Sequence, residues 1–441
     1  KTLKSESDMV AALNGMYSEL ADGKNLGSHV LIFGELVSDN AFISKRNDGR
    51  FKTTNEMSWT PSDDNNDFGH YNKLYDVVAQ ANLIINTEIE ETDKVKGIKA
   101  QAYAARGLAF YYLASFYAEN PTSGRNQEYG IAIHTGEYNP NAYYARKTVA
   151  ETYEQIISDL ENGISTYNET TENKGYLTAN AARIALAKTY LTRGTEGDYQ
   201  KAISLADTVL ANASSNLLTK EQLKSYFAGT TSAETKNQPE TVFEMNMSLN
   251  ANPGVNESIS SYFDPEGSKN YLMFRQDFVQ TLAATDVRKE LFTQENASSN
   301  DEPMGHFLLK FRQKIDGNNF TGNVRIIRLT EVKFIKWEAM AKSGQGAAAL
   351  AELNAFSAER GGKSYTGDAL TAILAEKRIE FIGEGLRFFD LKRNNLPIVK
   401  TTNVRGGVYN VPTDSKLFVF PIPSSSLNLN KLITQYPGWG N

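Results

Sequence analysis

The sequence predicts a mostly α-helical protein built from tetratricopeptide-like helical pairs, with a less regular, loop-rich part that contains a few short strands. In three separate segments, apolar residues recur at positions i, i+3, i+4 and i+7, which places them in one stripe along a helix. A tyrosine leads each of these sets: Tyr71, Leu74, Tyr75 and Val78; Tyr153, Ile156, Ile157 and Leu160; Tyr199, Ala202, Ile203 and Ala206.

A second type of helix alternates with the first. The pattern Leu-Ala-x-x-Tyr-Leu occurs at residues 108–113 and 186–191, and residues 329–334 form a degenerate third copy. Small residues on a neighbouring face, such as Ala105 and Ala185, let helices approach each other closely. Alternation of tyrosine-led and alanine-rich helices is typical of tetratricopeptide repeats, and this supports the predicted fold class.

The chain is interpreted as a single unit over residues 1–441. We expect its helical scaffold at approximately residues 70–213 and 327–394. Within the second part, the pattern predicts helices at residues 327–342 and 368–394, and the last of these ends the scaffold.

Two long stretches, residues 37–68 and 217–323, lack a helical pattern and are treated as irregular insertions. The second contains a predicted strand at residues 241–247. The C-terminal tail, residues 417–441, cannot form a continuous helix because it contains three prolines. Loops of this length in a compact protein are usually functional or disordered, so binding residues are sought there first.

Composition excludes several classes of function. The chain has no Cys and four His, so thiolate zinc sites, iron–sulfur clusters and cysteine nucleophiles are excluded, and no pair of His has helical ligand spacing. With 46 Lys and Arg against 52 Asp and Glu, the net charge of −6 gives no basic surface for nucleic acid. No apolar run approaches the roughly 20 residues of a membrane-spanning helix. We expect no metal, no cofactor and no nucleic-acid partner.

An acidic turn in the first insertion partly matches the spacing of a calcium-binding loop. Asp63, Asn65 and Asp67 occupy positions one, three and five of such a loop, but position six is Phe68 instead of Gly and position twelve is Leu74 instead of Glu. The sequence therefore favours a solvated turn over an irregular cation site.

A series of motifs extends along most of the chain. They are Ala11 to Tyr17, Glu35 to Asn40, Tyr71 to Asn86, Ile326 to Glu331, Ala349 to Asn354, Glu359 to Gly361, Glu376 to Phe381, Gly383 to Arg393, Pro421 to Pro423 and Gln435 to Trp439. This series resembles the SusD/RagB family of outer-membrane nutrient-binding lipoproteins, whose members are starch-binding-like. Lys333, Trp337 and Ser357 depart from the family pattern.

The resemblance implies both a fold and a role. The implied fold has tetratricopeptide-like pairs and an irregular, ligand-facing half. The implied role is non-catalytic binding of extracellular glycan oligosaccharides and their delivery to a TonB-dependent, SusC-like transporter. A signal peptide and a lipid-anchored Cys upstream of Lys1 are also implied, with the protein exposed at the cell outer membrane. Peptides or other nutrients are the alternative ligands.

Four charged residues near the C-terminus are spaced by three: Glu384, Arg387, Asp390 and Arg393. On one helix, adjacent members of this set can form structural ion pairs. The alternative is a glycosidase in which Glu384 and Asp390 are the two carboxylates. We favour ion pairs, because the flanking arginines would keep both carboxylates ionised.

Trp59 is the first candidate for ligand contact, since it lies in a polar segment of the first insertion, where an exposed indole could stack on a sugar ring. The alternative is a Trp59 side chain folded back onto the helices. Trp337 and Trp439 are expected to pack inside the protein. The other ligand-binding candidates are Tyr262, Phe263, Tyr271 and Phe274, with Asp39, Asn40, Arg46 and Arg275 as polar partners.

Two further functions remain open from the sequence. A glycoside hydrolase on a helical scaffold would need two suitably separated carboxylates in a cleft. A pure repeat scaffold would bind a peptide or protein on its concave face and would show no affinity for small ligands.

Overall fold

The computed structural model describes residues 2–46, 49–62, 68–294, 305–400 and 410–440. The fold is mostly α-helical, as predicted. The longer helices are α1 (Glu6–Ala21), α2 (His29–Leu36), α5 (Gly69–Ile85), α6 (Asp93–Tyr117), α7 (Val149–Asn162), α8 (Ala179–Arg193), α9 (Asp198–Ala213), α14 (Leu329–Ala341), α15 (Gly346–Glu359), α16 (Ala369–Phe381) and α17 (Arg387–Arg393). The shorter helices are α3 (Lys52–Glu56), α10 (Leu223–Ala228), α11 (Ser232–Thr235), α12 (Ile259–Phe263), α13 (Gln276–Gln280) and α18 (Ser424–Leu429).

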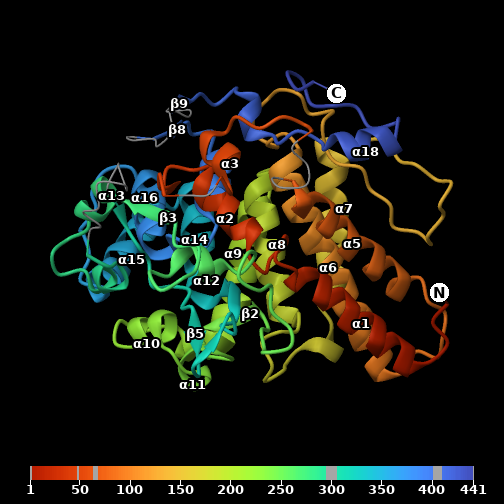
Figure 1. The fold of residues 1–441 in the computed structure, drawn as a ribbon, viewed down its shortest axis with the longest axis horizontal. Coiled ribbons are helices and arrows are strands. Elements are labelled where there is room, and N and C mark those ends of the chain that lie inside the picture. Colours follow the sequence, from red (N-terminus) through yellow and green to blue (C-terminus); the bar gives the residue numbers. More distant parts are fainter. Residues whose placement is uncertain (1, 47–48, 63–67, 295–304, 401–409, 441) are drawn as a thin grey trace.

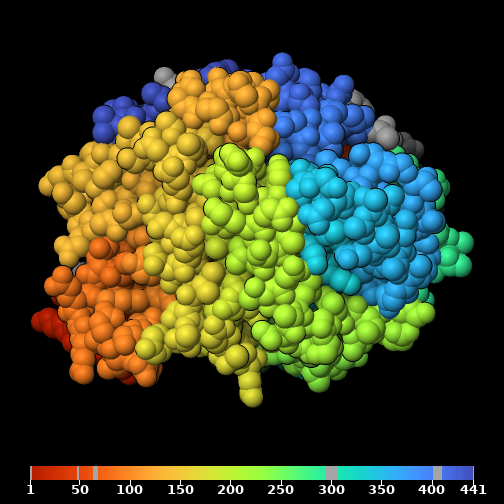
Figure 2. Space-filling model, turned by 180° about the vertical axis from the view of Figure 1, so that it is seen from behind, coloured from red at the N-terminus to blue at the C-terminus, as the bar shows by residue number. Residues whose placement is uncertain are grey.

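The long helices pack on one another in chain order (Figure 1). Helix α5 packs on α6, α6 on α7, α7 on α8 and α8 on α9, and α14 continues the stack from α9 to α15 and α16. Figure 2 shows the result from behind, where the colours follow the sequence across the molecule from orange through green to blue. The tyrosine-led stripes and the alanine-rich segments fall on alternating helices, which confirms the predicted helical pairs.

Local sequence determines where these helices begin and end. The hydroxyls of Thr92, Thr148 and Thr178 accept hydrogen bonds from backbone N–H groups in the first turns of α6, α7 and α8. At α7, Glu151 completes a capping box with Thr148. Helix α8 ends at Gly194, whose φ of 62° suits a residue without a Cβ.

The scaffold predicted for residues 70–213 is interrupted. Residues 118–148 contain no helix and only one isolated β-bridge, between Ala132 and Arg146. Figure 1 shows this segment as a long loop that extends outward from the helices. The predicted scaffold thus includes a long loop, because Pro121, Gly130 and Pro140 interrupt the helical pattern.

Short strands join the two insertions. In one three-stranded sheet, the middle strand β3 pairs antiparallel with β1 and with β4. At the end of β3, the backbone N–H of Arg275 donates a hydrogen bond to the carbonyl of Asn40. Strand β2 falls in the predicted segment and pairs with β7. The strands are β1 (Ala41–Ile43), β2 (Thr241–Met245), β3 (Leu272–Arg275), β4 (Gly305–His306), β5 (Lys314–Ile315), β6 (Asn318–Asn319), β7 (Val324–Arg328), β8 (Ile398–Val399) and β9 (Asn410–Val411).

The predicted helix over residues 368–394 is wrong as a single element, since the chain forms α16 and α17 with a turn between them. Gly383 and Gly385 in this turn have φ angles of 84° and 81°, a region that favours glycine and ends the helix. The predicted helix at residues 327–342 also begins later, because Ile327 and Arg328 belong to β7.

Two of the three tryptophans pack as expected. Trp337 is buried in a separate apolar cluster and donates to Glu352 at 2.6 Å. The indole N–H of Trp439 donates to the carbonyl of Val419 at 2.8 Å. Within the described ranges, no helix combines the length and the apolar character needed to cross a membrane.

Candidate ligand-binding groove

The polar candidates of the first insertion are held inside the protein. Asp39 accepts hydrogen bonds from Arg387 at 2.8 and 3.0 Å. Burial opposes ionisation of Asp39, but Arg378 and Arg387 outweigh it and lower the pKa of this carboxyl to about 2. Asn40 is buried between Arg378 and Glu35. Its amide oxygen accepts a hydrogen bond from Arg378 at 2.8 Å, and its amide N–H donates to the Glu35 carboxylate at 2.9 Å. These groups connect the first insertion to the C-terminal helices.

Trp59 is buried, with 3% of its surface exposed, so the expectation of an exposed indole platform is wrong. Its ring lies 6.0 Å from that of Phe68, 5.2 Å from that of Phe420 and 6.1 Å from that of Trp439. The C-terminal tail covers this part of the first insertion, which a local sequence pattern could not show.

The aromatic candidates of the second insertion are mostly core residues as well. Tyr262, Phe263 and Phe274 are fully buried, and Arg275 is buried over the ring of Phe42. Tyr271 is half-buried against the core. Arg46, also half-buried, donates to the carbonyl of Asn270 at 3.0 Å. The pairing of β1 with β3 thus brings the ligand-binding candidates of the first and second insertions close together. Most of their side chains, however, are packed inside the protein.

The four charged residues of the C-terminal motif all form ion pairs, mostly with other elements. Arg393 pairs with Asp390 and with Glu338, each at 2.7 Å. Glu384 lies in the turn before α17 and pairs with Arg328 at 2.8 Å. Arg387 is the partner of Asp39 described above. Spacing alone could not identify these distant partners.

Neither carboxylate of the alternative glycosidase pair has the properties of a general acid. Burial opposes the ionisation of both, but Arg328 and Lys310 lower the pKa of Glu384, and Lys377 and Arg393 lower the pKa of Asp390. A general acid at neutral pH needs a raised pKa. Asp63, Asn65 and Asp67, the residues of the acidic turn, lie outside the described residues.

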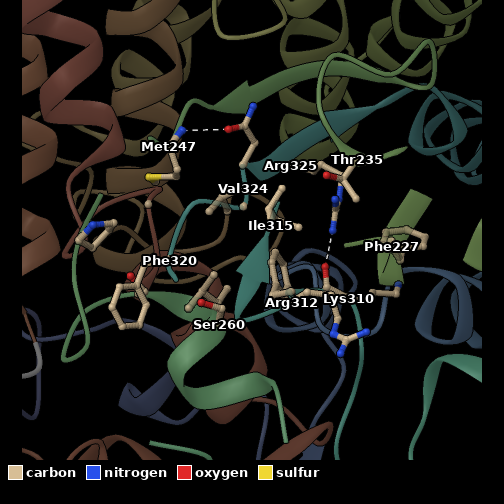
Figure 3. Close-up of a pocket in the computed structure, with 18 residues that line it drawn as sticks. Phe227, Thr235, Met247, Ser260, Lys310, Arg312, Ile315, Phe320, Val324 and Arg325 are labelled. Carbon is tan, nitrogen blue, oxygen red and sulfur yellow. Dashed lines mark hydrogen bonds between the residues drawn. The ribbon is translucent and has the colours of Figure 1, made fainter. Parts of the chain in front are cut away.

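A small cavity lies among β2, β7 and the β5–β6 hairpin (Figure 3). Its volume is about 20 Å³, enough for about one water molecule. In Figure 3 the Arg325 side chain points to the carbonyl of Lys310, and a dashed line marks their hydrogen bond. This space is too small for an organic ligand.

A much larger groove opens at the other end of the helical stack, with a volume of about 720 Å³. This volume is within the range of ligand pockets. One wall is α5, and the other is the loop between residues 132 and 144, with α18 and the N-terminal residues at the ends. The lining residues used below are Tyr71, Asn72, Tyr75, Asn82, Asn86, Glu88, His134, Glu137, Tyr138, Tyr144, Leu429 and Asn430.

Helix α5 positions the loop through one polar stripe. Tyr75, Asn82 and Asn86 are separated by seven and four residues, so they lie along one side of the helix. Tyr75 donates to the carbonyl of Ala132 at 2.8 Å, and Asn82 donates to that of His134 at 2.9 Å. Asn86 donates to the carbonyl of Thr135 at 3.0 Å. The loop backbone is therefore fixed at three successive points.

Buried charge supports this attachment from behind. Arg106 donates to the Asn82 side-chain oxygen at 2.9 Å and binds Asp159 through two nitrogens, at 2.9 and 2.6 Å. On the opposite side, Asn430 donates to the carbonyl of Tyr144 at 2.9 Å. The rings of His134 and Tyr144 are stacked, with centroids 4.4 Å apart. The groove is consequently formed before any ligand arrives.

Aromatic and amide side chains share the groove surface. Tyr138 is 85% exposed, and Leu429 at the other end is 73% exposed. Aromatic faces offer apolar area to the C–H faces of sugar rings, and amides such as those of Asn72 and Asn430 can bind hydroxyl groups. The groove can therefore hold a polar ligand that also has apolar faces.

None of the ligand-binding residues predicted from the sequence lines this groove. The missed residues lie in the loop at residues 118–148 and on the polar side of α5. Glycine and proline in the loop were available signals, and the seven- and four-residue spacing of Tyr75, Asn82 and Asn86 was another.

Family models match almost the whole chain. The model described as "Starch-binding associating with outer membrane" matches residues 1–191, and the model of the SusD family matches residues 166–439. A curated SusD-like protein from Formosa agariphila is 27% identical over 217 residues, which are 47% of this chain and 40% of that protein. The chain thus matches about two-fifths of the length of this relative.

Solved structures share the fold along their full lengths. A putative sugar binding protein from Bacteroides vulgatus is 25% identical, and the match covers 100% of both chains with a TM-score of 0.87. A SusD superfamily protein from Bacteroides thetaiotaomicron is also 25% identical, with 98% of this chain and 100% of that chain covered and a TM-score of 0.85. A SusD superfamily protein from Bacteroides vulgatus, 24% identical over 100% of both chains, shares the fold with a TM-score of 0.89.

Proposed function

The chain belongs to the SusD family, and on this premise we propose that it binds glycan oligosaccharides at the cell surface and delivers them to a TonB-dependent, SusC-like transporter. The observation that carries the proposal is the preformed groove of about 720 Å³ lined by aromatic and amide side chains. The description of one family model as starch-binding and associated with the outer membrane supports the ligand class and the location.

The groove lining has the two properties that sugar recognition requires. Tyr138 offers an exposed ring, and Tyr144 is held in position by its stack with His134. Stacking on such rings gives affinity, while hydrogen bonds from amides fix the orientation of the sugar. A rigid groove also loses little entropy when it binds.

Binding without turnover fits the placement of the carboxylates. Glu384 and Asp390 are paired with cations inside the protein, where they stabilise the C-terminal helices. Incubation of the pure protein with a glycan panel should release no reducing ends. Sustained hydrolysis would instead support the alternative of a glycosidase.

The binding experiment uses a panel of neutral and anionic oligosaccharides, measured by calorimetry with the wild type and two tyrosine variants. Tyr138→Ala removes an exposed ring from the groove, and we expect affinity to fall by about tenfold, which corresponds to one aromatic contact. Tyr143→Ala is the matched control, because Tyr143 belongs to the same loop, is 51% exposed and does not line the groove.

Two results would contradict the proposal. If no oligosaccharide binds the folded wild type, glycan capture fails as the function. If Tyr138→Ala and Tyr143→Ala reduce affinity equally, glycan binds elsewhere, and half-buried Arg46 and Tyr271 become the next residues to test.

Delivery and anchoring are tested on the native membrane. We propose attachment through an acylated cysteine upstream of Lys1, so the protein should partition into detergent and co-purify with a large outer-membrane barrel. Recovery without such a partner after cross-linking would contradict delivery. Loss of the partner in Tyr138→Ala, with glycan affinity unchanged, would identify the groove as the partner's surface instead.

A further inference from the structure

The charged side chains among the described lining residues of the groove are all acidic. Among the lining residues that the structure describes there is no Lys or Arg, whereas Glu88 and Glu137 are both acids and both exposed. Glu88 follows α5, and Glu137 lies in the facing loop, so each wall of the groove includes one acidic side chain. The whole chain adds a net charge of −6.

Arg106 and Arg146 lie outside the groove lining and are bonded to other groups. Arg106 is buried and binds Asp159, Asn82 and the carbonyl of Thr135 behind the wall. Arg146 donates to the carbonyls of Gly130, Tyr117 and Thr434. An anionic ligand in the groove therefore meets neither guanidinium as a lining group.

Apart from the two acids, the polar side chains that line the groove are amides, hydroxyls and the imidazole of His134. Within the described structure, the side chain of Asn72 is exposed and forms no hydrogen bond, and Asn430 uses one amide hydrogen on Tyr144. Amides both donate and accept, as sugar hydroxyls do. Carboxylates and sulfates are bound in proteins chiefly through charge-assisted bonds to Arg and Lys.

We infer that the groove binds uncharged glycans and discriminates against glycans that carry uronate or sulfate groups. This inference rests on the proposed function. Attraction comes from the aromatic and amide lining, while Glu88 and Glu137 repel an anion, for which the described lining residues offer no Lys or Arg partner. The discrimination weakens with salt, because exposed charges are screened over about 10 Å at 0.1 M.

The test uses hexasaccharides in matched pairs that differ at C6 of each ring. Neutral gluco-, manno- and galacto-hexaoses are compared with the corresponding uronate hexamers and with a sulfated galactan, each by calorimetry at low and at physiological salt. The tightest ligand of the set should be uncharged, with its uronate counterpart at least tenfold weaker. The ratio of neutral to uronate affinity should decrease as salt is added.

Variants assign the discrimination to the two acids. The double variant Glu88→Gln with Glu137→Gln should reduce the ratio several-fold, because uronate binding strengthens when the two negative charges are removed. The control, Glu90→Gln with Glu128→Gln, removes the same charge from exposed acids outside the groove lining, and its ratio should equal that of the wild type.

Each other outcome has a distinct meaning. A uronate or sulfated glycan as the tightest ligand overturns the inference and leaves the proposed function intact. If the ratio of neutral to uronate affinity is the same in the two double variants, Glu88 and Glu137 do not cause the discrimination. If no glycan binds, the proposed function itself fails.

Discussion

At the scale of single residues, Trp59 joins the first insertion to the C-terminal tail. Its ring contacts Phe68 on one side and Phe420 and Trp439 on the other. Aromatic pairs in such edge-to-face and tilted arrangements add to the free energy gained by burying their surface. Trp59 is therefore a packing residue, and two of its partners, Phe420 and Trp439, lie more than 350 positions further along the chain.

We expect Trp59→Ala to lower the free energy of unfolding by about 3–5 kcal/mol, because a buried aromatic side chain leaves a cavity. Thermal unfolding followed by circular dichroism measures this change. Tyr138→Ala serves as the control and should leave the melting temperature nearly unchanged, since Tyr138 is exposed. An unchanged melting temperature in Trp59→Ala would contradict the observed packing.

Glu35 is a second residue whose surroundings set its chemistry. It is fully buried on α2, where it accepts hydrogen bonds from Asn40 and from the backbone N–H of Gly385, both at 2.9 Å. Burial raises the pKa of the Glu35 carboxyl to about 7, although these hydrogen bonds act in the opposite direction. The folded protein thus holds this proton more tightly than the unfolded chain.

Because the folded-state pKa is the higher one, Glu35 lowers stability progressively as pH rises from about 4.5 to about 7. Glu35→Gln removes this dependence. We expect the difference in unfolding free energy, variant minus wild type, to increase by up to roughly 3 kcal/mol between pH 4 and pH 8. Urea unfolding of both proteins at each pH gives the difference, from which all other titrating groups cancel. Parallel curves would show that Glu35 does not titrate in this window.

At the scale of elements, the turn between α16 and α17 is fitted to α2. A Cβ added to Gly34 would lie 2.3 Å from the carbonyl oxygen of Gly385, and one added to Gly385 would lie 2.9 Å from the Cα of Leu31. The two backbones approach this closely only because both positions lack a side chain. The Gly-Glu-Gly segment thus turns the chain, docks on α2 and places Glu384 beside Arg328.

Gly385→Ala and Gly344→Ala separate backbone strain from packing. Both glycines have a φ of 81°, but no atom lies within 4 Å of a Cβ at Gly344. We expect Gly344→Ala to cost about 1–2 kcal/mol from backbone strain alone. Gly385→Ala should cost a further 1–3 kcal/mol, because the new methyl group overlaps α2. Equal melting temperatures for the two variants would argue against the close contact.

At the scale of the whole molecule, one apolar core crosses the scaffold, the insertions and the tail. A single cluster contains Leu13 of α1, Tyr153 of α7, Phe274 of β3 and Phe420 of the tail. The insertions are therefore not appended to a finished helical stack, since their side chains fill part of the same interior.

This shared core predicts one cooperative unfolding transition. In scanning calorimetry, the calorimetric and van't Hoff enthalpies should agree, as they do when no intermediate is populated. Two separated heat-absorption peaks would show instead that the stack and the insertions unfold as independent units. If the folded protein binds glycan as proposed and the unfolded chain does not, a saturating ligand should raise the single melting temperature.

The sequence by itself was sufficient for the helical stack and for the family. Residues such as Tyr153 and Ile157 are close in the chain, so the helix alone brings them to one face, and periodicity reveals that face. The strand at Thr241–Met245 could be anticipated for the same reason. Gly383 and Gly385 are visible in the sequence too, but they lie inside a pattern that predicts one continuous helix.

Only the tertiary structure decided which side chains line the groove and which are buried. Whether Trp59 is exposed depends on Phe420, and the groove exists because Asn82 on α5 holds the backbone of His134. Such contacts join segments far apart in the chain, and their formation depends on how the helices and loops pack, which leaves no periodic signal. Local periodicity therefore determined the elements, while burial and the groove followed from long-range packing.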